Sequence, residues 1–196
     1  MAKRPLEDAP EVEVQSRAEL RAWLSANGAT SSGVWLVTHK KSEGERYVST
    51  EEIVLECLAH GWVDSLTRGK DERRSMLWIS PRRPGSNWSR VNKGYVARLE
   101  AEGRMTPAGR ALIDRAKQDG TWAALDGVEN LEVPPDLAAA LDGPLRAIWD
   151  AYPRSVRRGA LEILLNAKRP ETRAAKVAAI REAAGRGERP FQWRRS

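Results

Sequence analysis

The spacing of apolar residues predicts a front part that mixes helices with strands. Two capping boxes, Ser16–Glu19 and Ser49–Glu52, each precede apolar residues at helical spacing, so each predicts the start of a helix. The first of these helices is expected to end at a left-handed glycine, Gly28. Between the two helices, residues 33–39 are β-branched and aromatic, which is typical of a strand covered on both faces.

Further strands and helices are expected before residue 121. Residues 62–66 and 75–80 read as two strands joined by a polar loop that holds the charged run Lys70–Arg74. Prolines and Gly85 then indicate a turn, because proline can continue neither a ladder nor a helix interior. Gly103 marks the end of one helix, and Thr106 followed by Pro107 marks the start of the next. The turn and the two helices are predicted at residues 81–85, 89–101 and 107–120.

The back part of the chain has only helical spacing. Prolines begin several of its segments, and the last two carry apolar stripes with helical periodicity. Helices are predicted at residues 135–141, 144–151, 153–167 and 171–184. The expected fold class is therefore α+β: a small antiparallel sheet with helices in the N-terminal part, followed by an all-helical C-terminal module.

These patterns also predict how the chain is divided. The expected parts are a disordered tail at 1–15, an α+β domain at 16–120, a linker at 121–133, a helical module at 134–186 and a basic tail at 187–196. A chain of 196 residues is long enough to bury a core without disulfides or structural metals.

Composition narrows the chemistry that the chain can carry. Hydrophobic residues make up 41 % and charged residues 31 %, which indicates a folded globular protein. Cys57 is the one cysteine, and its apolar neighbours indicate a small buried side chain. Together with the two histidines, His39 and His60, it makes too small a set of donors for most metal sites, so no metal is expected. Motifs for nucleotide cofactors are absent, and no cofactor is expected. The first ten residues do not resemble a signal peptide and no apolar run could span a membrane, so a cytoplasmic location is the expectation.

Positive charge is concentrated in two blocks. The net charge is +6, yet residues 146–196 hold 13 basic and 5 acidic residues, and residues 62–98 hold 9 and 3. Basic surfaces attract anionic partners such as an anionic small molecule, an acidic protein surface or nucleic acid. The alternative is that these charges are the solvated faces of helices.

The segment from Trp62 to Lys93 is the best candidate for a site. Its arginines lie on a turn before a helix start, where free amides and a partial positive charge favour an anion, and a tryptophan there could stack on a base or sugar. The predicted ligand-binding residues are Trp62, Asp64, Arg82, Arg83, Ser86, Trp88, Ser89 and Lys93. Asp64 is a weak candidate for a catalytic acid or base. The competing interpretation is that the tryptophans fill a core and that Asp64 pairs internally with an arginine.

Several motifs resemble one bacterial family. The runs Gly61-Trp62-Val63-Asp64, Pro81 to Lys93 and Glu102 to Gly109, together with Val133-Pro134 through Arg173, resemble the YdeI/OmpD-associated or bacteriocin-protection family. The resemblance extends from about residue 16 to residue 186. It implies a link to stress or bacteriocin tolerance and an association with an outer-membrane porin. It implies no reaction, cofactor or catalytic residue.

Three hypotheses for function follow. The leading one is a non-enzymatic cytoplasmic protein of the YdeI/OmpD-associated type that binds an anionic ligand or partner through the Arg/Trp-rich segment. The first alternative is a nucleic-acid-binding accessory protein that uses the basic C-terminal helices. The second alternative is a small enzyme acting on a phosphorylated or carboxylated metabolite, with Asp64 as acid–base and Arg82 or Arg83 holding the anion.

Overall fold

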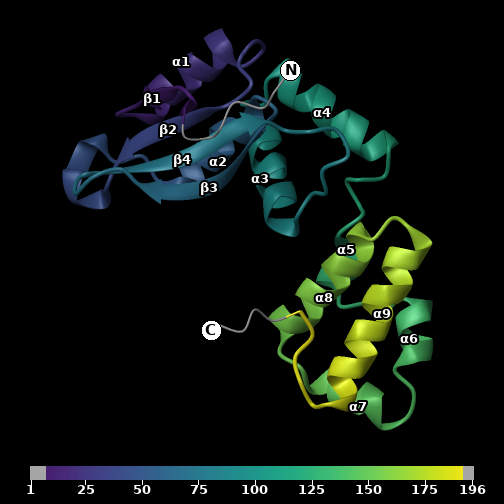
Figure 1. Ribbon diagram of the computed structural model, residues 1–196. Coiled ribbons are helices and arrows are strands. Elements are labelled where there is room, and N and C mark those ends of the chain that lie inside the picture. Colours follow the sequence, from purple (N-terminus) through teal and green to yellow (C-terminus); the bar gives the residue numbers. More distant parts are fainter. Residues whose placement is uncertain (1–7, 192–196) are drawn as a thin grey trace. The chain divides into compact units, whose positions relative to one another are not determined.

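The computed structural model describes residues 8–191, and these form two compact units (Figure 1). Unit 1 takes in the described residues up to Ser86 together with Val91–Thr121. Unit 2 takes in Asn87–Arg90 and the described residues from Trp122 onward. The predicted tails fall partly outside the described residues, at 1–7 and 192–196.

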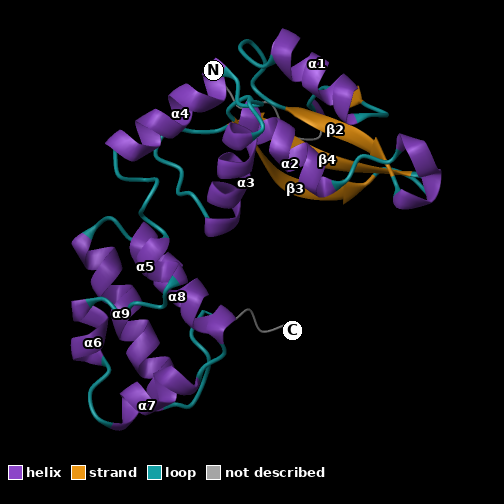
Figure 2. Cartoon of the chain, turned by 180° about the vertical axis from the view of Figure 1, so that it is seen from behind, coloured by secondary structure: helices purple, strands orange, loops and turns teal. Residues whose placement is uncertain are grey.

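Unit 1 is built on a four-stranded mixed sheet. The strand order is β1-β2-β4-β3, in which β1 runs parallel to β2 and the other neighbours are antiparallel. Helix α2 covers one face: it lies behind the sheet in Figure 1 and in front of it in Figure 2. The elements of unit 1 are β1 (Glu11–Glu13), α1 (Arg17–Asn27), β2 (Val34–His39), the 3-10 segment η2 (Lys41–Arg46), α2 (Thr50–Ala59), β3 (Trp62–Gly69), β4 (Arg74–Pro81), α3 (Arg90–Ala101) and α4 (Pro107–Gln118). Arg90, the first residue of α3, is assigned to unit 2.

Local sequence signals explain how the helices of unit 1 begin. The Ser16 side chain accepts a hydrogen bond from the backbone of Glu19, and Ser49 and Glu52 form the reciprocal capping box that the sequence predicts. Thr106 caps α4 in the same way, with Pro107 as its first residue. The side chains of α1 and α2 then meet alternate residues of the sheet in one core, made by Leu20, Leu24, Leu36, Ile53, Cys57, Trp62, Leu77, Ile79 and their neighbours.

The structure differs from the predictions for unit 1 at two places. Strand β1 lies inside the predicted disordered tail, because Glu11–Glu13 pairs with β2 and Val14 behind it is buried in the core. The prediction of a left-handed stop at Gly28 is wrong, since its φ is −62°. Glycine is needed there for another reason: a Cβ would lie 2.4 Å from the carbonyl oxygen of Leu24.

Unit 2 is a helical bundle. Helix α9 packs against α6, α7 and α8, and α8 also packs against α5. The core includes Leu137, Trp149, Leu164 and Ile180, all of which are at most 1 % exposed. The elements are α5 (Asp126–Glu129), α6 (Pro135–Ala140), α7 (Pro144–Ala151), α8 (Arg154–Asn166) and α9 (Pro170–Gly185).

The segment that the sequence predicts as a linker, 121–133, is part of this bundle. Leu125 and Val128 enter its core and place α5 against α8. The sequence gives no clear helical pattern here because α5 itself spans only four residues, Asp126–Glu129. The predicted fold class, α+β with an all-helical C-terminal part, is confirmed, and the parallel pairing of β1 makes the sheet mixed.

Candidate functional site

Trp62, the first of the predicted site residues, is a core residue. Its side chain is 1 % exposed, its Nε1–H donates to the Gly28 carbonyl at 3.1 Å, and its ring meets that of Trp23 edge-on with centroids 5.7 Å apart. Both the face and the polar edge of the indole are therefore used inside unit 1. For this residue the structure favours the core interpretation.

Trp88 and Ser89 belong to unit 2, whereas the other predicted residues belong to unit 1. The Trp88 ring is buried and packs on Trp122 with centroids 5.1 Å apart. Beside it, the backbone N–H of Arg90 donates to both carboxylate oxygens of Glu129, at 3.0 and 3.1 Å. The anion expected at this helix start is thus supplied by a side chain of unit 2 itself.

Arg82 and Asp64 lie close enough to interact electrostatically. Burial lowers the pKa of Arg82, and the nearby negative charge of Asp64 opposes that shift. Asp64 faces the core side of the sheet, opposite Ile79.

The other predicted residues are more accessible. The Ser86 hydroxyl donates to the Arg83 carbonyl at 2.7 Å. The Arg83 side chain is exposed, and Ser89 and Lys93 are half-buried. Ligand binding by these residues stays a prediction.

Many basic side chains of unit 2 make contacts inside the unit. Arg154 donates to the Glu129 carbonyl, Arg158 to Glu162 at 2.9 Å, and Arg173 to both oxygens of Asp136 at 2.6 and 2.9 Å. Arg181 reaches the Ala140 carbonyl at 3.2 Å. These contacts favour a structural role for much of this charge.

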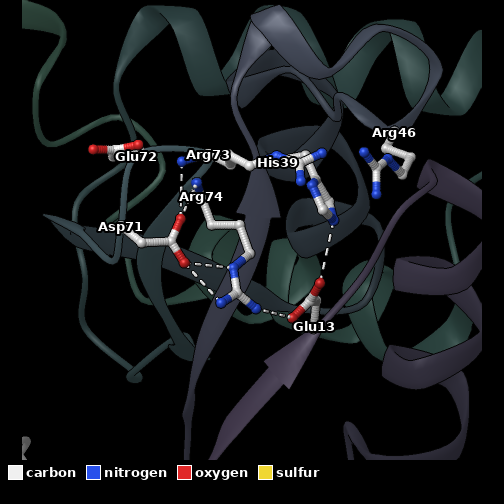
Figure 3. Close-up of a pocket in the computed structure, with 7 residues that line it drawn as sticks. All are labelled: Glu13, His39, Arg46, Asp71, Glu72, Arg73 and Arg74. Atoms are coloured by element: carbon white, nitrogen blue, oxygen red, sulfur yellow. Dashed lines mark hydrogen bonds and ion pairs between the residues drawn. The ribbon is translucent and has the colours of Figure 1, made fainter.

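A pocket of charged side chains lies at one end of the sheet of unit 1 (Figure 3). We call it the ionic pocket; its cavity measures about 470 Å³. The ends of β1 and β2, the start of β4, the β3–β4 turn and η2 converge here. The lining residues are Glu13, His39, Arg46, Asp71, Glu72, Arg73 and Arg74.

A chain of four side chains runs along one wall of the ionic pocket. His39 Nε2 lies 3.2 Å from Glu13 Oε1, and Glu13 Oε2 accepts from Arg74 Nη1 at 2.7 Å. Arg74 also donates from Nε to Asp71 at 2.7 Å. The hydrogen bond from Arg74 is the main reason why the pKa of Glu13 is lowered. An ionised Glu13 can only accept, so the His39 Nε2 carries the proton.

In the neutral ring, this arrangement makes the other nitrogen of His39, Nδ1, an acceptor. The residue is 6 % exposed, and its Nδ1 has no hydrogen-bond partner within residues 8–191. A buried polar atom without a partner is costly, and in native proteins it frequently marks a place for a water or a ligand group.

Two arginines complete the ionic pocket. Arg73 Nε donates to Glu43 Oε2 at 3.0 Å, and Arg46 Nη2 donates to the same oxygen at 2.7 Å. Their side chains are nevertheless 64 % and 42 % exposed, so much of each guanidinium faces solvent. In the view of Figure 3, their head groups lie to either side of the His39 ring.

The charge pairing predicts an acid titration at Asp71. The side-chain hydrogen bond from Arg74, then backbone N–H donors, lower the Asp71 pKa from 3.8 to about 2. Its contribution to stability is therefore complete above its unfolded pKa and is lost as the pH falls through about 2. Carboxyl NMR titration should give a midpoint near 2, and Arg74→Gln should move it toward 3.8. A midpoint of 3.8 in the unmodified chain would contradict the pairing.

Sequence reasoning singled out few residues of the ionic pocket. Arg73 and Arg74 were expected only as part of a charged loop, and Glu13, His39 and Arg46 were not expected at all. Two signals were present: a histidine ends a buried strand, and a dense charge run fills a hairpin turn. Their partners lie far away in sequence, for example 61 residues between Glu13 and Arg74.

Comparison with protein families divides the chain in two. Residues 12–112 match the family model described as Domain of unknown function (DUF8412), and residues 130–187 match the model Bacteriocin-protection, YdeI or OmpD-Associated. The resemblance to the latter family is thus confirmed over residues 130–187. No curated protein and no solved structure matches the chain.

The described residues hold neither a candidate membrane span nor a candidate metal cluster. From residue 8 to residue 191, no helix is long and apolar enough to cross a membrane. Over the same range, no group of three or more His, Cys, Asp or Glu side chains could hold a metal ion. Cys57 is buried as expected, and burial raises its pKa, which disfavours the reactive thiolate.

Proposed function

The chain belongs to the family described as Domain of unknown function (DUF8412) and carries a bacteriocin-protection, YdeI or OmpD-associated region; from this premise we propose that it is a binding protein of the YdeI/OmpD-associated type whose ionic pocket receives a small anionic ligand. The ligand class is a carboxylate or a phosphate group. This moves the expected anion site from the Trp62–Lys93 surface to the far end of the same sheet.

One observation carries the proposal. Two guanidinium groups, on side chains that are 64 % and 42 % exposed, line the pocket together with a buried imidazole whose Nδ1 has no hydrogen-bond partner among the described residues. Guanidinium groups bind oxyanions in paired, directional hydrogen bonds, and a neutral imidazole protonated at Nε2 can accept a hydrogen bond from the ligand at Nδ1. Hydrogen phosphate offers both features in one small molecule, since it has charged oxygens and a hydroxyl. A cavity of about 470 Å³ has room for such a group on a small metabolite.

Calorimetric titration with inorganic phosphate and with acetate, at low ionic strength, tests this function. We expect saturable binding in the millimolar range, and we expect Arg73→Gln to weaken it about fivefold or more because one charged donor is lost. Arg83→Gln is the matched control, since it removes an exposed arginine of the surface that the sequence favoured.

The outcomes separate the competing sites. Weaker binding in the Arg73 variant alone supports the ionic pocket. Weaker binding in the Arg83 variant alone places the anion on the Trp62–Lys93 surface and contradicts the proposal. Absence of binding by either anion contradicts anion binding altogether. Retention on DNA across a salt series remains the separate test for the nucleic-acid alternative.

A further inference from the structure

Glu43 bridges two of the arginines that line the ionic pocket, Arg46 and Arg73. One of its carboxylate oxygens accepts from Arg73 Nε, Arg73 Nη2 and Arg46 Nη2. The side chain is 11 % exposed, although the two arginines that hold it are far more open to solvent. These charge-assisted bonds lower the Glu43 pKa, and Arg73 is the largest cause.

The contacts of Glu43 are those that an anionic ligand would need. A carboxylate bridging two guanidinium groups satisfies the same fork-shaped donors that bind carboxylates and phosphates from solution. The three arginines that line the cavity, Arg46, Arg73 and Arg74, face three lining carboxylates, and Glu43 beside them adds a fourth. With this excess of carboxylates the pocket exerts no net attraction on an anion, and withdrawal of Glu43 removes the excess.

Glu43 is also the carboxylate that is easiest to withdraw. It lies on η2, a segment in which no residue is buried. Gly44, the next residue, has φ 63° and ψ −121° and interrupts the helical turn, which gives the segment a natural bending point. Glu13, in contrast, belongs to a strand, and Asp71 is fixed by the backbone N–H groups of Arg73 and Arg74 at 2.9 and 2.7 Å. Segments with few buried contacts open at low cost.

The geometry points to Glu43 as an internal competitor: its carboxylate holds Arg46 and Arg73 until a carboxylate or phosphate group of the ligand replaces it and the part of η2 before Gly44 moves away, while Arg46, which lies beyond Gly44, stays at the pocket. This inference rests on the proposed function, because it concerns the regulation of the same pocket. The ligand must therefore bring at least one oxyanion that binds two arginines at once.

Phosphate titration of Glu43→Gln tests the competition. We expect this variant to bind inorganic phosphate about tenfold more tightly than the unmodified chain, since the amide is a poorer partner for the guanidinium groups. Glu45→Gln is the matched control: it removes the same charge from an exposed position on the same segment, and we expect less than about a twofold change.

The results distinguish this inference from the function on which it rests. Unchanged or weaker phosphate binding in Glu43→Gln, with normal binding by the unmodified chain, overturns the competition and leaves the anion site. Absence of phosphate binding by both overturns the two together. Amide hydrogen exchange of the unmodified chain provides a second readout that needs no variant. Phosphate should speed exchange in residues 41–46, and slower exchange there would contradict release of Glu43.

Discussion

Replacing Glu56 with glutamine is expected to destabilise unit 1 by about 3–5 kcal/mol, because it breaks a buried ion cluster. The Glu56 side chain is 0 % exposed. Its Oε1 accepts from Arg17 Nε and from Arg104 Nη2, both at 2.7 Å, and Arg21 lies 4.0 Å from Oε2. The carboxylate thereby ties α1 and the α3–α4 loop to α2. Without it, the half-buried guanidinium group of Arg17 loses its counter-charge, and that of Arg104 keeps only Glu102 at 3.7 Å.

Urea unfolding followed by tryptophan fluorescence measures this loss. The matched control is Glu51→Gln on the same helix, which breaks an exposed ion pair with Arg98 and should cost less than about 1 kcal/mol. Equal, small effects of the two variants would show that the buried cluster does not hold the three segments together.

Replacing Trp62 with alanine is expected to cost about 3–5 kcal/mol, the usual range for a large buried aromatic side chain. The change leaves a cavity among α1, α2 and the sheet, and it removes the hydrogen bond to the Gly28 carbonyl. The Gly28 carbonyl would then lose a buried donor, which adds to the loss of packing.

The control for this substitution lies four residues along the same strand. Leu66 is 49 % exposed, so Leu66→Ala should change the unfolding free energy by less than about 0.5 kcal/mol. A similarly small effect of Trp62→Ala would contradict its place in the core. It would restore the interpretation of Trp62 as a surface residue available to a ligand.

The fold could be predicted well where the determining signals are local. Ser16, Ser49 and Thr106 cap helices as expected, since a cap depends on residues three positions apart. Strand β1 was missed because three residues with two glutamates carry almost no pattern of their own; their pairing with Trp35, Leu36 and Val37 of β2 makes them a strand. Helix α5 was missed for a similar reason, since its apolar contacts are made with α8.

The candidate site could be predicted much less well. Trp62 and Trp88 look like ligand residues in the sequence because arginines surround them, but burial is a tertiary property and removes both from solvent. Glu129 and Glu56 show the same limit for charge. Each lies in a segment whose sequence gives no indication of a partner, and each pairs with arginines about 40 residues away. The ionic pocket likewise exists only once the ends of three strands and η2 meet.

Side-chain NMR of the two histidines tests the anion site most directly. His39 lines the ionic pocket, and its Nδ1 has no hydrogen-bond partner among the described residues. Both ring nitrogens of His60 are engaged, Nδ1 with the Glu56 carbonyl at 2.9 Å and Nε2 with Ser25 at 3.1 Å. During a phosphate titration at constant pH, the nitrogen signals of His39 should shift and saturate while those of His60 stay in place. Unmoved His39 signals at saturating phosphate, or equal shifts of both rings, would contradict binding in the ionic pocket.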